Sequence, residues 1–142
     1  MTSDKFLFLD FDGVLHPTTH GSTLFSNAHL LEGIFSKQQH CNIVISSSWR
    51  FHVDLEEIKL RLPDVIQPHI IGVTGNAYIG QYARYHDIVG YLHYRDKHFA
   101  EWKALDDSWI EFPEDCENLI RCNPNTGITD QKVNLLIEWL KK

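Results

Sequence analysis

The feature that most constrains the fold is a series of five short apolar runs, separated from one another by segments of a different pattern. The first run, residues 6–10, is a continuous stretch of large apolar side chains closed by an aspartate. Such a run is typical of a strand that is buried on both faces of a sheet. The other four runs cover residues 42–45, 69–73, 102–105 and 119–122.

Helical patterns fill most of the segments between these runs. Residues 28–39 place Leu30, Leu31, Ile34 and Phe35 on one face of a helix. Three more helices are predicted: residues 55–60 after an Asp54 N-cap, residues 81–94, and a last one from an Asp130 N-cap with Val133, Leu136, Ile137 and Leu140 facing inward. Because strands alternate with helices, we predict a three-layer α/β fold of the Rossmann-like type. Its centre is a parallel five-stranded sheet with helices on both faces.

The length and composition are those of one ordinary globular domain. The chain has 142 residues, of which 43% are hydrophobic and 23% are charged. No uncharged apolar run approaches the length of a membrane span, and the first residues lead into a strand instead of a signal peptide. We therefore expect a single domain over residues 1–142, a cytoplasmic location and no membrane partner.

Charge, cysteines and histidines argue against several other classes. The net charge of -6 disfavours binding of a long polyanion over a broad surface, although it permits a local cationic pocket. Cys41, Cys116 and Cys122 form neither a Cys-x-x-Cys pair nor a zinc spacing, so we predict reduced thiols. The nine histidines match no zinc pattern such as His-Glu-x-x-His.

Three of the predicted strands end in chemically reactive side chains. Asp10 and Asp12 close the first strand, a run of three serines (residues 46–48) follows the second, and Asp106 with Asp107 follows the fourth. An Asp-x-Asp pair alone is common by chance in an acidic chain. However, the carboxyl ends of parallel strands share one edge of the sheet, where ligands of α/β proteins bind. We therefore expect these groups to form one site.

The expected site suits phosphate chemistry with a divalent metal. Four carboxylates on one edge repel each other unless a cation neutralises them, and ligands that are all oxygen select a hard ion such as Mg²⁺. Mg²⁺ commonly recruits phosphate oxygens, and serine hydroxyls can bind the same group. One carboxylate can attack phosphorus, and a second one two residues on can protonate the leaving oxygen.

These motifs resemble the haloacid dehalogenase (HAD) superfamily of Asp-nucleophile phosphatases. The signature Asp-x-Asp-Gly-(Val/Thr)-Leu is matched by residues 10–15, and the apolar strand that ends in Ser or Thr by residues 43–46. The acidic pair after an apolar strand is matched by residues 105–108. The resemblance implies a HAD-like fold and a Mg²⁺-dependent phosphomonoester hydrolase that acts through an aspartyl-phosphate.

The resemblance also implies residue roles. Asp10 is expected to be the nucleophile and a metal ligand, and Asp12 the general acid/base, whose backbone carbonyl also binds the metal. Ser46 would bind the phosphoryl group, with Ser47 beside it. The Leu-Asp-Asp-Ser pattern favours Asp107 as a direct metal ligand, with Asp106 supporting the metal from behind it.

The cation that neutralises the nucleophile and the phosphate is the least determined role. Arg84 is preferred because it opens the helix before the fourth strand, where the superfamily places this cation. Lys97 and Lys103 are the alternatives. Arg50, four residues beyond Ser46, is a further candidate for gripping phosphate, with an exposed salt-bridging arginine as the competing interpretation.

The substrate can be predicted only as a class. The segment between the first two strands is filled by a short flap and one helix, so we expect no large cap over the site. An open site favours a phosphorylated substrate that brings its own bulk, such as a nucleic-acid end, a nucleotide or a phosphoprotein, and a small ester remains a candidate. No obligate protein partner is indicated. Four aromatic side chains are candidates for base stacking, with packing as the alternative: Trp49, Tyr78, Tyr82 and Trp109.

The string Ser-Ser-Ser-Trp-Arg, combined with Leu-Asp-Asp and an Arg-opened helix, also resembles a narrower branch of the superfamily. That branch occurs as a domain in RNA-repair proteins of bacteria and phages. A receiver-like module that accepts phosphate on aspartate is an alternative, but a receiver carries its acidic pair on the first strand. A non-catalytic phosphate-binding protein is the third hypothesis.

Overall fold

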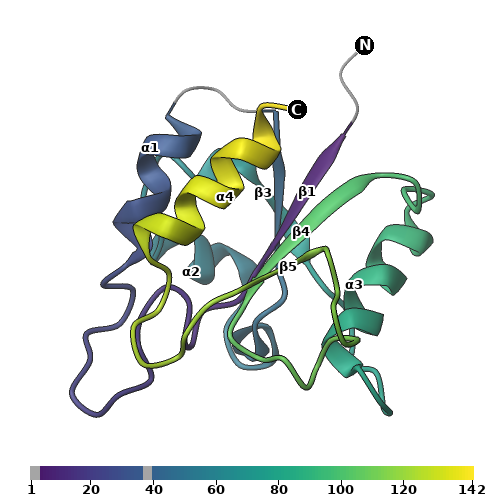
Figure 1. The fold of residues 1–142 in the computed structure, drawn as a ribbon, viewed down its shortest axis with the longest axis horizontal. Coiled ribbons are helices and arrows are strands. Elements are labelled where there is room, and N and C mark those ends of the chain that lie inside the picture. Colours follow the sequence, from purple (N-terminus) through teal and green to yellow (C-terminus); the bar gives the residue numbers. More distant parts are fainter. Residues whose placement is uncertain (1–3, 37–39) are drawn as a thin grey trace.

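The computed structural model describes residues 4–36 and 40–142. Its strands are β1 (Lys5–Leu9), β2 (Asn42–Ile45), β3 (Ile70–Val73), β4 (Glu101–Asp106) and β5 (Leu119–Arg121). All four pairings are parallel, and the strand order is β3-β2-β1-β4-β5 (Figure 1). The predicted fold class is therefore confirmed, and each strand lies within one residue of its predicted bounds.

The helices are α1 (Glu32–Phe35), α2 (Leu55–Leu60), α3 (Ala83–Tyr94) and α4 (Asp130–Leu140), with the 3-10 turns η1 (Ala28–Leu31), η2 (Ser48–Phe51) and η3 (Gln67–His69). The prediction for α2 is confirmed, because the Asp54 side chain accepts a hydrogen bond from Glu57 N at 2.9 Å and caps the helix.

The other helix predictions need correction at their ends. The segment predicted as one helix over 28–39 is a 3-10 turn followed by one turn of α-helix up to residue 35, and residues 37–39 lie outside the described residues. Asp130 is the first residue of α4, and the N-cap is Thr129. Helix α3 begins at Ala83 instead of residue 81, because Tyr82 adopts a left-handed conformation with φ 56°.

The sheet separates two apolar cores, which makes three layers. Leu7 and Leu9 of β1 face the core beneath α1, α2 and α4, whereas Phe6 and Phe8 face the core beneath α3 (Figure 1). All five residues of β1 are buried, as its continuous apolar run predicted. The central strand is thus fixed from both faces, and so is the point where it ends.

Lys5 ties the beginning of β1 to the end of α4. Its Nζ donates to the carbonyl oxygen of Trp139 at 2.8 Å and lies 3.4 Å from that of Lys142. The side chain is 6% exposed. A positive charge at the C-terminus of a helix is favoured by the exposed carbonyls of its last turn.

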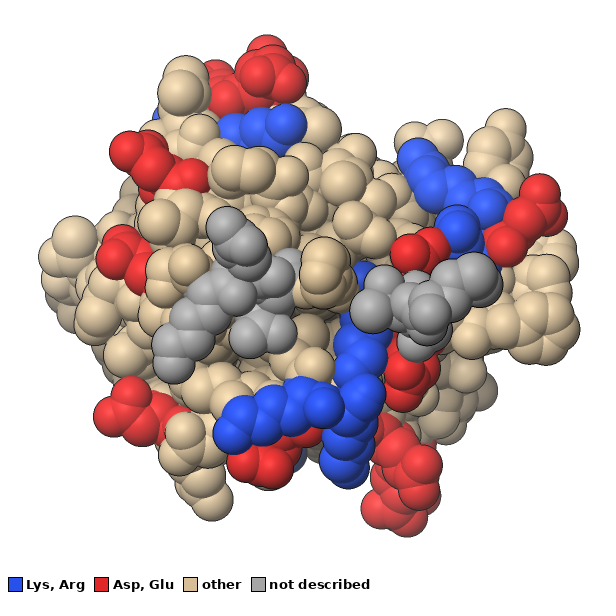
Figure 2. All heavy atoms as spheres, turned by 90° about the horizontal axis from the view of Figure 1, so that it is seen from above, with Lys and Arg blue, Asp and Glu red and all other residues tan. Residues whose placement is uncertain are grey.

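Charged side chains are scattered over the face at the amino ends of the strands. Figure 2 shows this face, on which basic side chains form a short row at the lower centre and smaller groups at the top and the upper right, with acidic side chains near each of them. This pattern agrees with the modest net charge of -6. Among the described residues, no helix is long and apolar enough to cross a membrane.

Candidate active site

The topology brings the ends of three strands together. The chain adds β2 and β3 on one side of β1 and then β4 and β5 on the other, so the strand order reverses between β1 and β4. Such a switch point opens a crevice at the carboxyl ends of the strands. Leu9 pairs with Leu105, and Asp10 N donates to Leu105 O at 3.1 Å. Ser46 N donates to Leu9 O at 3.0 Å, so Ser46 also lies beside Asp10.

Three carboxylates converge at this crevice. One carboxylate oxygen each from Asp10, Asp106 and Asp107 lies within 4.8 Å of the other two. Asp10 is 6% exposed and Asp106 is 1% exposed. Close backbone approach is needed here, because a Cβ on Gly13 would lie 2.3 Å from Asp107 Oδ2. The glycine of the first motif therefore makes room for the third carboxylate.

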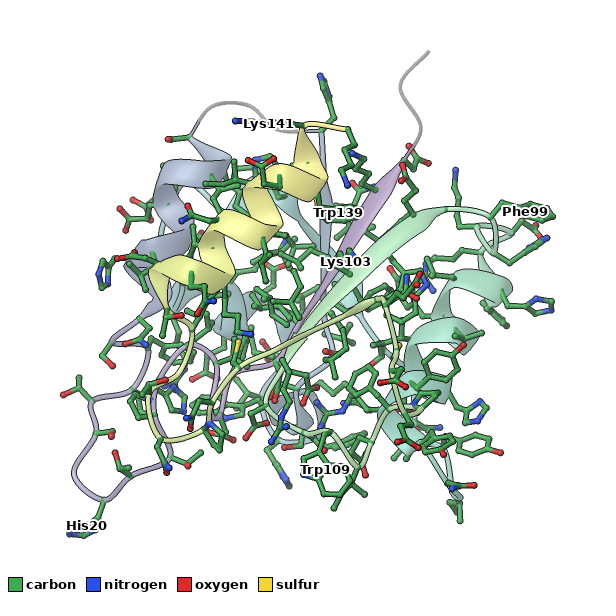
Figure 3. All side chains as sticks on the ribbon, viewed as in Figure 1. His20, Phe99, Lys103, Trp109, Trp139 and Lys141 are labelled. Atoms are coloured by element: carbon green, nitrogen blue, oxygen red, sulfur yellow. The ribbon has the colours of Figure 1, made fainter. Side chains whose placement is uncertain are left out.

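Arg84 is the cation that the structure places at these carboxylates. Its Nη1 lies 2.7 Å from Asp106 Oδ2 and 3.6 Å from Asp10 Oδ1. The alternatives lie elsewhere: Lys97 Nζ pairs with Asp4 at 2.7 Å, and Lys103 Nζ donates to Glu117 O at 2.7 Å (Figure 3). The position of Arg84 at the start of α3 brings its charge to the edge of the sheet.

Burial and charge shift the ionisation of this cluster. Burial and the neighbouring Asp106 carboxylate raise the pKa of Asp10 well above its ordinary value, although Arg84 acts in the opposite direction. Burial also raises the pKa of Asp106 to about 6, again against the effect of Arg84. For Arg84, burial lowers the pKa, but Asp106 and Asp10 outweigh it and the pKa is raised. The acidic groups of this cluster outnumber the one arginine that contacts them, so its positive charge offsets their negative charge only in part.

Asp12 is not one of the three grouped carboxylates, and two side chains contact its oxygens. Its side chain is 52% exposed, Oδ1 lies 2.7 Å from His16 Nε2, and Oδ2 accepts from Trp49 Nε1 at 3.3 Å. Phe25 N donates to His16 Nδ1 at 3.2 Å. Since Nδ1 accepts in that bond, the neutral ring carries its proton on Nε2 and donates it to Asp12.

The two predicted serine positions differ in their contacts. Ser46 is fully buried, and its Oγ has no hydrogen-bond partner among the described residues. Buried hydroxyls are normally paired, so this one is available to a ligand oxygen. Ser47 Oγ instead accepts from Trp49 N at 3.2 Å and caps η2. The geometry favours Ser46 over Ser47 as a phosphate ligand.

Arg50 is engaged with the protein itself. Its side chain is 3% exposed, Nη1 donates to Ser46 O at 2.9 Å and to Ser47 O at 3.0 Å, and Nη2 pairs with Asp87 at 3.2 Å. Its Nε also donates to Gly75 O at 3.1 Å. Four of the five N–H donors are therefore used. These contacts favour a structural role for Arg50 over the predicted grip on phosphate, and they also differ from the exposed salt bridge that was the alternative.

The four candidate stacking residues divide into two groups. Trp49 packs against Phe11 and Phe25, and Tyr78 stacks on His86 with ring centroids 4.4 Å apart. Tyr82 and Trp109 line a cavity beside the site.

Two residues around the site were not predicted from the sequence. His16 stands four residues after Asp12, and Asp87 stands three residues after Arg84. Both spacings are visible in the sequence, but the sequence shows neither that His16 meets Asp12 nor that Arg50 meets Asp87. These contacts form only when the chain has folded.

The parallel sheet, with its carboxylates at the switch point, is consistent with the HAD-like class of α/β domains. Specifically, the chain belongs to the family of HAD domains in Swiss Army Knife RNA repair proteins, whose model matches residues 6–133. The superfamily and the RNA-repair branch predicted from the motifs are thereby confirmed. Comparison with curated proteins and with solved structures found no significant match. Membership of this family indicates phosphatase-type chemistry.

The donor set fits the metal that HAD proteins generally use. Asp10, Asp106 and Asp107 offer only carboxylate oxygens, which suit Mg²⁺. Asp10 and Asp106 are buried with little positive charge around them, and this also suits a site for a cation.

Proposed function

We propose that the protein is a Mg²⁺-dependent phosphomonoesterase in which Asp10 is the nucleophile. The observation that carries the proposal is the convergence of Asp10, Asp106 and Asp107 within 4.8 Å of one another, with Arg84 in contact with two of them. Mg²⁺ held by these acids would neutralise them and withdraw charge from the phosphoryl oxygens.

The side chains divide the reaction between them. The Asp10 carboxylate attacks phosphorus while the bond to the leaving oxygen breaks, and Asp12 gives that oxygen a proton. Asp12 then takes a proton from the water that cleaves the aspartyl-phosphate, which regenerates Asp10 and releases phosphate. Arg84 and the unpaired Ser46 hydroxyl bind the phosphoryl oxygens.

His16 and Trp49 position the proton carrier. Their N–H groups donate to the two oxygens of Asp12 and hold the carboxylate at the mouth of the site. With its side chain 52% exposed, Asp12 can reach a leaving group that enters from solvent. Asp10 is buried, at 6% exposed, and in this proposal it contacts the phosphoryl group.

We also propose that the domain has no large cap. Between β1 and β2, the described residues form a loop, η1 and α1, and only nine residues separate β3 from α3. An open crevice admits a phosphate at the end of a bulky molecule, which supports a nucleic-acid end or a nucleotide as the substrate. The family's occurrence in RNA repair proteins supports the same class.

Replacement of the nucleophile tests the mechanism. Asp10→Asn should lower the rate of hydrolysis of an aryl phosphate by at least about a thousandfold, because the amide cannot attack phosphorus. The measurement is phosphate release with and without Mg²⁺, with circular dichroism to verify folding. Asp64→Asn is the matched control, since Asp64 is exposed and its side chain contacts Gln67 outside the site.

The outcome also separates the alternatives. Activity of Asp10→Asn similar to that of the unmodified protein would contradict the mechanism. A folded unmodified protein that binds phosphorylated ligands without turnover would be a phosphate-binding module. A phosphoprotein that persists after treatment with acetyl phosphate would indicate a receiver-like role.

A further inference from the structure

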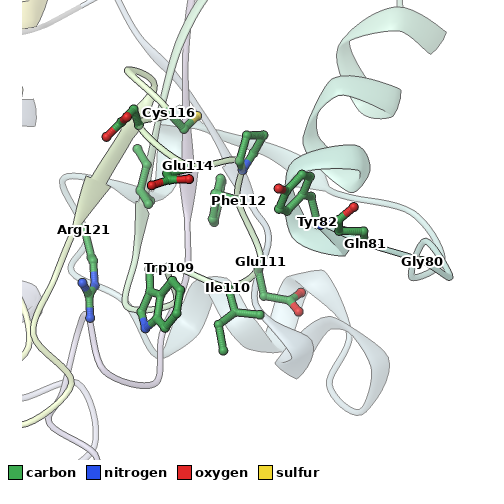
Figure 4. Close-up of a pocket in the computed structure, with 13 residues that line it drawn as sticks. Gly80, Gln81, Tyr82, Trp109, Ile110, Glu111, Phe112, Glu114, Cys116 and Arg121 are labelled. Carbon is green, nitrogen blue, oxygen red and sulfur yellow. The ribbon is translucent and has the colours of Figure 1, made fainter.

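A cavity of about 830 Å³ borders the site and has no role in the chemistry described above. Its walls come from residues 80–82 before α3, from the loop after β4 and from β5 (Figure 4). The floor is apolar and includes Phe112 and Leu119, whereas Trp109 and Ile110 at the edge are 62% and 65% exposed. The volume lies in the range of pockets that hold small organic ligands.

Two segments that line the cavity lie next to residues of the proposed catalytic cluster in the chain. Trp109 stands two residues after Asp107, and Tyr82 stands two residues before Arg84. Hydrogen bonds fix this arrangement, because Tyr85 N donates to Glu111 O at 3.1 Å and Glu111 N donates to Ser108 Oγ at 3.2 Å. A molecule with its phosphate at Asp10 therefore has the cavity beside it.

The lining indicates what kind of group would bind. Trp109 and Tyr82 come from different walls and offer two aromatic surfaces for a planar ring (Figure 4). Such surfaces stack with any nucleic-acid base, because every base has a π-face. An exposed tryptophan beside an exposed isoleucine is an apolar edge that a ligand would cover.

The charges of the lining exclude a phosphate and favour the edge of a base. Glu111, Glu114 and Asp115 outnumber the one basic residue, Arg121. An excess of carboxylates repels phosphodiesters but accepts hydrogen bonds from the amino and ring N–H groups of a base. A base is uncharged, planar and rich in such donors, so it matches both the aromatic surfaces and the acidic lining.

We propose that this cavity binds the base of the nucleotide whose terminal phosphate is placed at Asp10. The inference rests on the proposed phosphatase function for the position of the phosphate. It adds a specificity site built from Trp109 and Tyr82, and it selects a nucleotide over a sugar phosphate or a phosphopeptide.

The test measures binding separately from turnover. Two short RNAs are compared, one with an intact terminal nucleotide and one whose terminal base has been removed, each with a phosphate on the 3′ or the 5′ end. Binding is measured on the Asp10→Asn protein with Mg²⁺, and on the same protein carrying Trp109→Ala. Phe99→Ala is the matched control, because Phe99 is 92% exposed and lies in the turn before β4, away from Trp109 (Figure 3).

We expect Trp109→Ala to weaken binding of the intact RNA about tenfold and to leave binding of the abasic RNA unchanged, since stacking on an aromatic side chain is lost. Phe99→Ala should change neither. Equal loss for both RNAs, or no loss for either, would overturn the inference, as would a phosphopeptide that binds in a Trp109-dependent way.

Turnover by the protein with Asp10 intact is measured in parallel. Base-dependent binding without turnover would contradict the phosphatase and keep the base site. Turnover of both RNAs at equal rates, without a contribution from Trp109, would support the phosphatase and contradict the base site.

Discussion

At the scale of single residues, Gly13 decides whether the three carboxylates can meet. Its φ is +78°, and an added Cβ would lie 2.3 Å from Asp107 Oδ2 and 2.6 Å from its Cγ. The side chain of Asp107 would have to move, because the backbone of the first motif is held on the other side by the bond from Gly13 N to His16 O.

We therefore predict that Gly13→Ala removes stabilisation by Mg²⁺. The variant should lose about 1 kcal/mol of stability from backbone strain and, in addition, most of the rise in melting temperature on addition of the metal. Gly21→Ala is the control, because Gly21 has φ +85° and no atom within 4 Å of its added Cβ. It should show the strain but keep the metal response. Equal metal responses in the two variants would contradict the role of Gly13.

The predicted site residues that lie close together in the structure stand at strand ends. Asp10 directly follows β1, Ser46 directly follows β2, and Asp106 is the last residue of β4. The parallel register of these strands therefore brings the three residues together.

Arg50 contacts Gly75 and Asp87, which lie 25 and 37 residues away in the chain, and no local pattern encodes such contacts. His16 contacts Asp12 four residues away, but the spacing alone does not show that the two side chains meet. Their roles therefore needed the structure.

At the scale of the elements, a buried ion pair joins the segment after β2 to α3. Arg50 and Asp87 are 3% and 4% exposed, and Asp87 Oδ1 also accepts from Tyr78 N at 2.7 Å. Asp87 lies about one helical turn after Arg84 in α3. The Arg50–Asp87 pair therefore helps to fix the position of α3 relative to the site. Burial lowers the pKa of Arg50, and the neighbouring Asp87 carboxylate acts in the opposite direction.

We predict that Asp87→Ala lowers the free energy of unfolding by about 3–5 kcal/mol, because it leaves a buried arginine unpaired. Urea denaturation gives this value. Glu57→Ala is the control: it removes the partner of Arg61 from a pair that is 56% and 39% exposed, and it should cost less than about 1 kcal/mol. Similar losses in the two variants would show that the pair does not anchor α3.

The strands were predicted more accurately than the helices for a physical reason. A strand buried on both faces is a continuous apolar run with sharp polar ends, as in β1 and β2. The start of a helix depends on the backbone conformation of one residue, and the left-handed Tyr82 or the cap at Thr129 has no comparable sequence signal. The errors accordingly lie at helix ends and in residues 28–35, which form a 3-10 turn and one turn of α-helix instead of one continuous helix.

At the scale of the whole molecule, the acidic cluster makes the stability of the fold depend on pH. The pKa of Asp106 is about 6 and that of Asp10 is also raised, against 3.8 for an ordinary aspartate. The folded protein therefore binds more protons than the unfolded chain between these values. Without metal, this contribution stabilises the fold at low pH and is lost as the pH rises through about 6.

A bound cation reverses this dependence, because it requires the ionised acids. We predict that Mg²⁺ at a hundredfold excess over its Kd stabilises the protein by about 2.7 kcal/mol at pH 7.5 and scarcely at all at pH 4.5. Thermal unfolding at both pH values, with Mg²⁺ and with EDTA, measures this difference. A metal effect that is the same at both pH values would contradict a site made of Asp10 and Asp106.

The bond of Lys5 to the last turn of α4 has a consequence for the connectivity of the chain. Because Lys5 Nζ reaches the carbonyl oxygens of Trp139 and Lys142, the two ends of the described chain are neighbours, at the edge of the sheet opposite the crevice (Figure 1). The Lys5 side chain thus connects the first strand to the last residues of the described chain. A circularly permuted chain, joined there by a short linker and opened in an exposed turn, would keep every strand neighbour and leave the catalytic edge unobstructed.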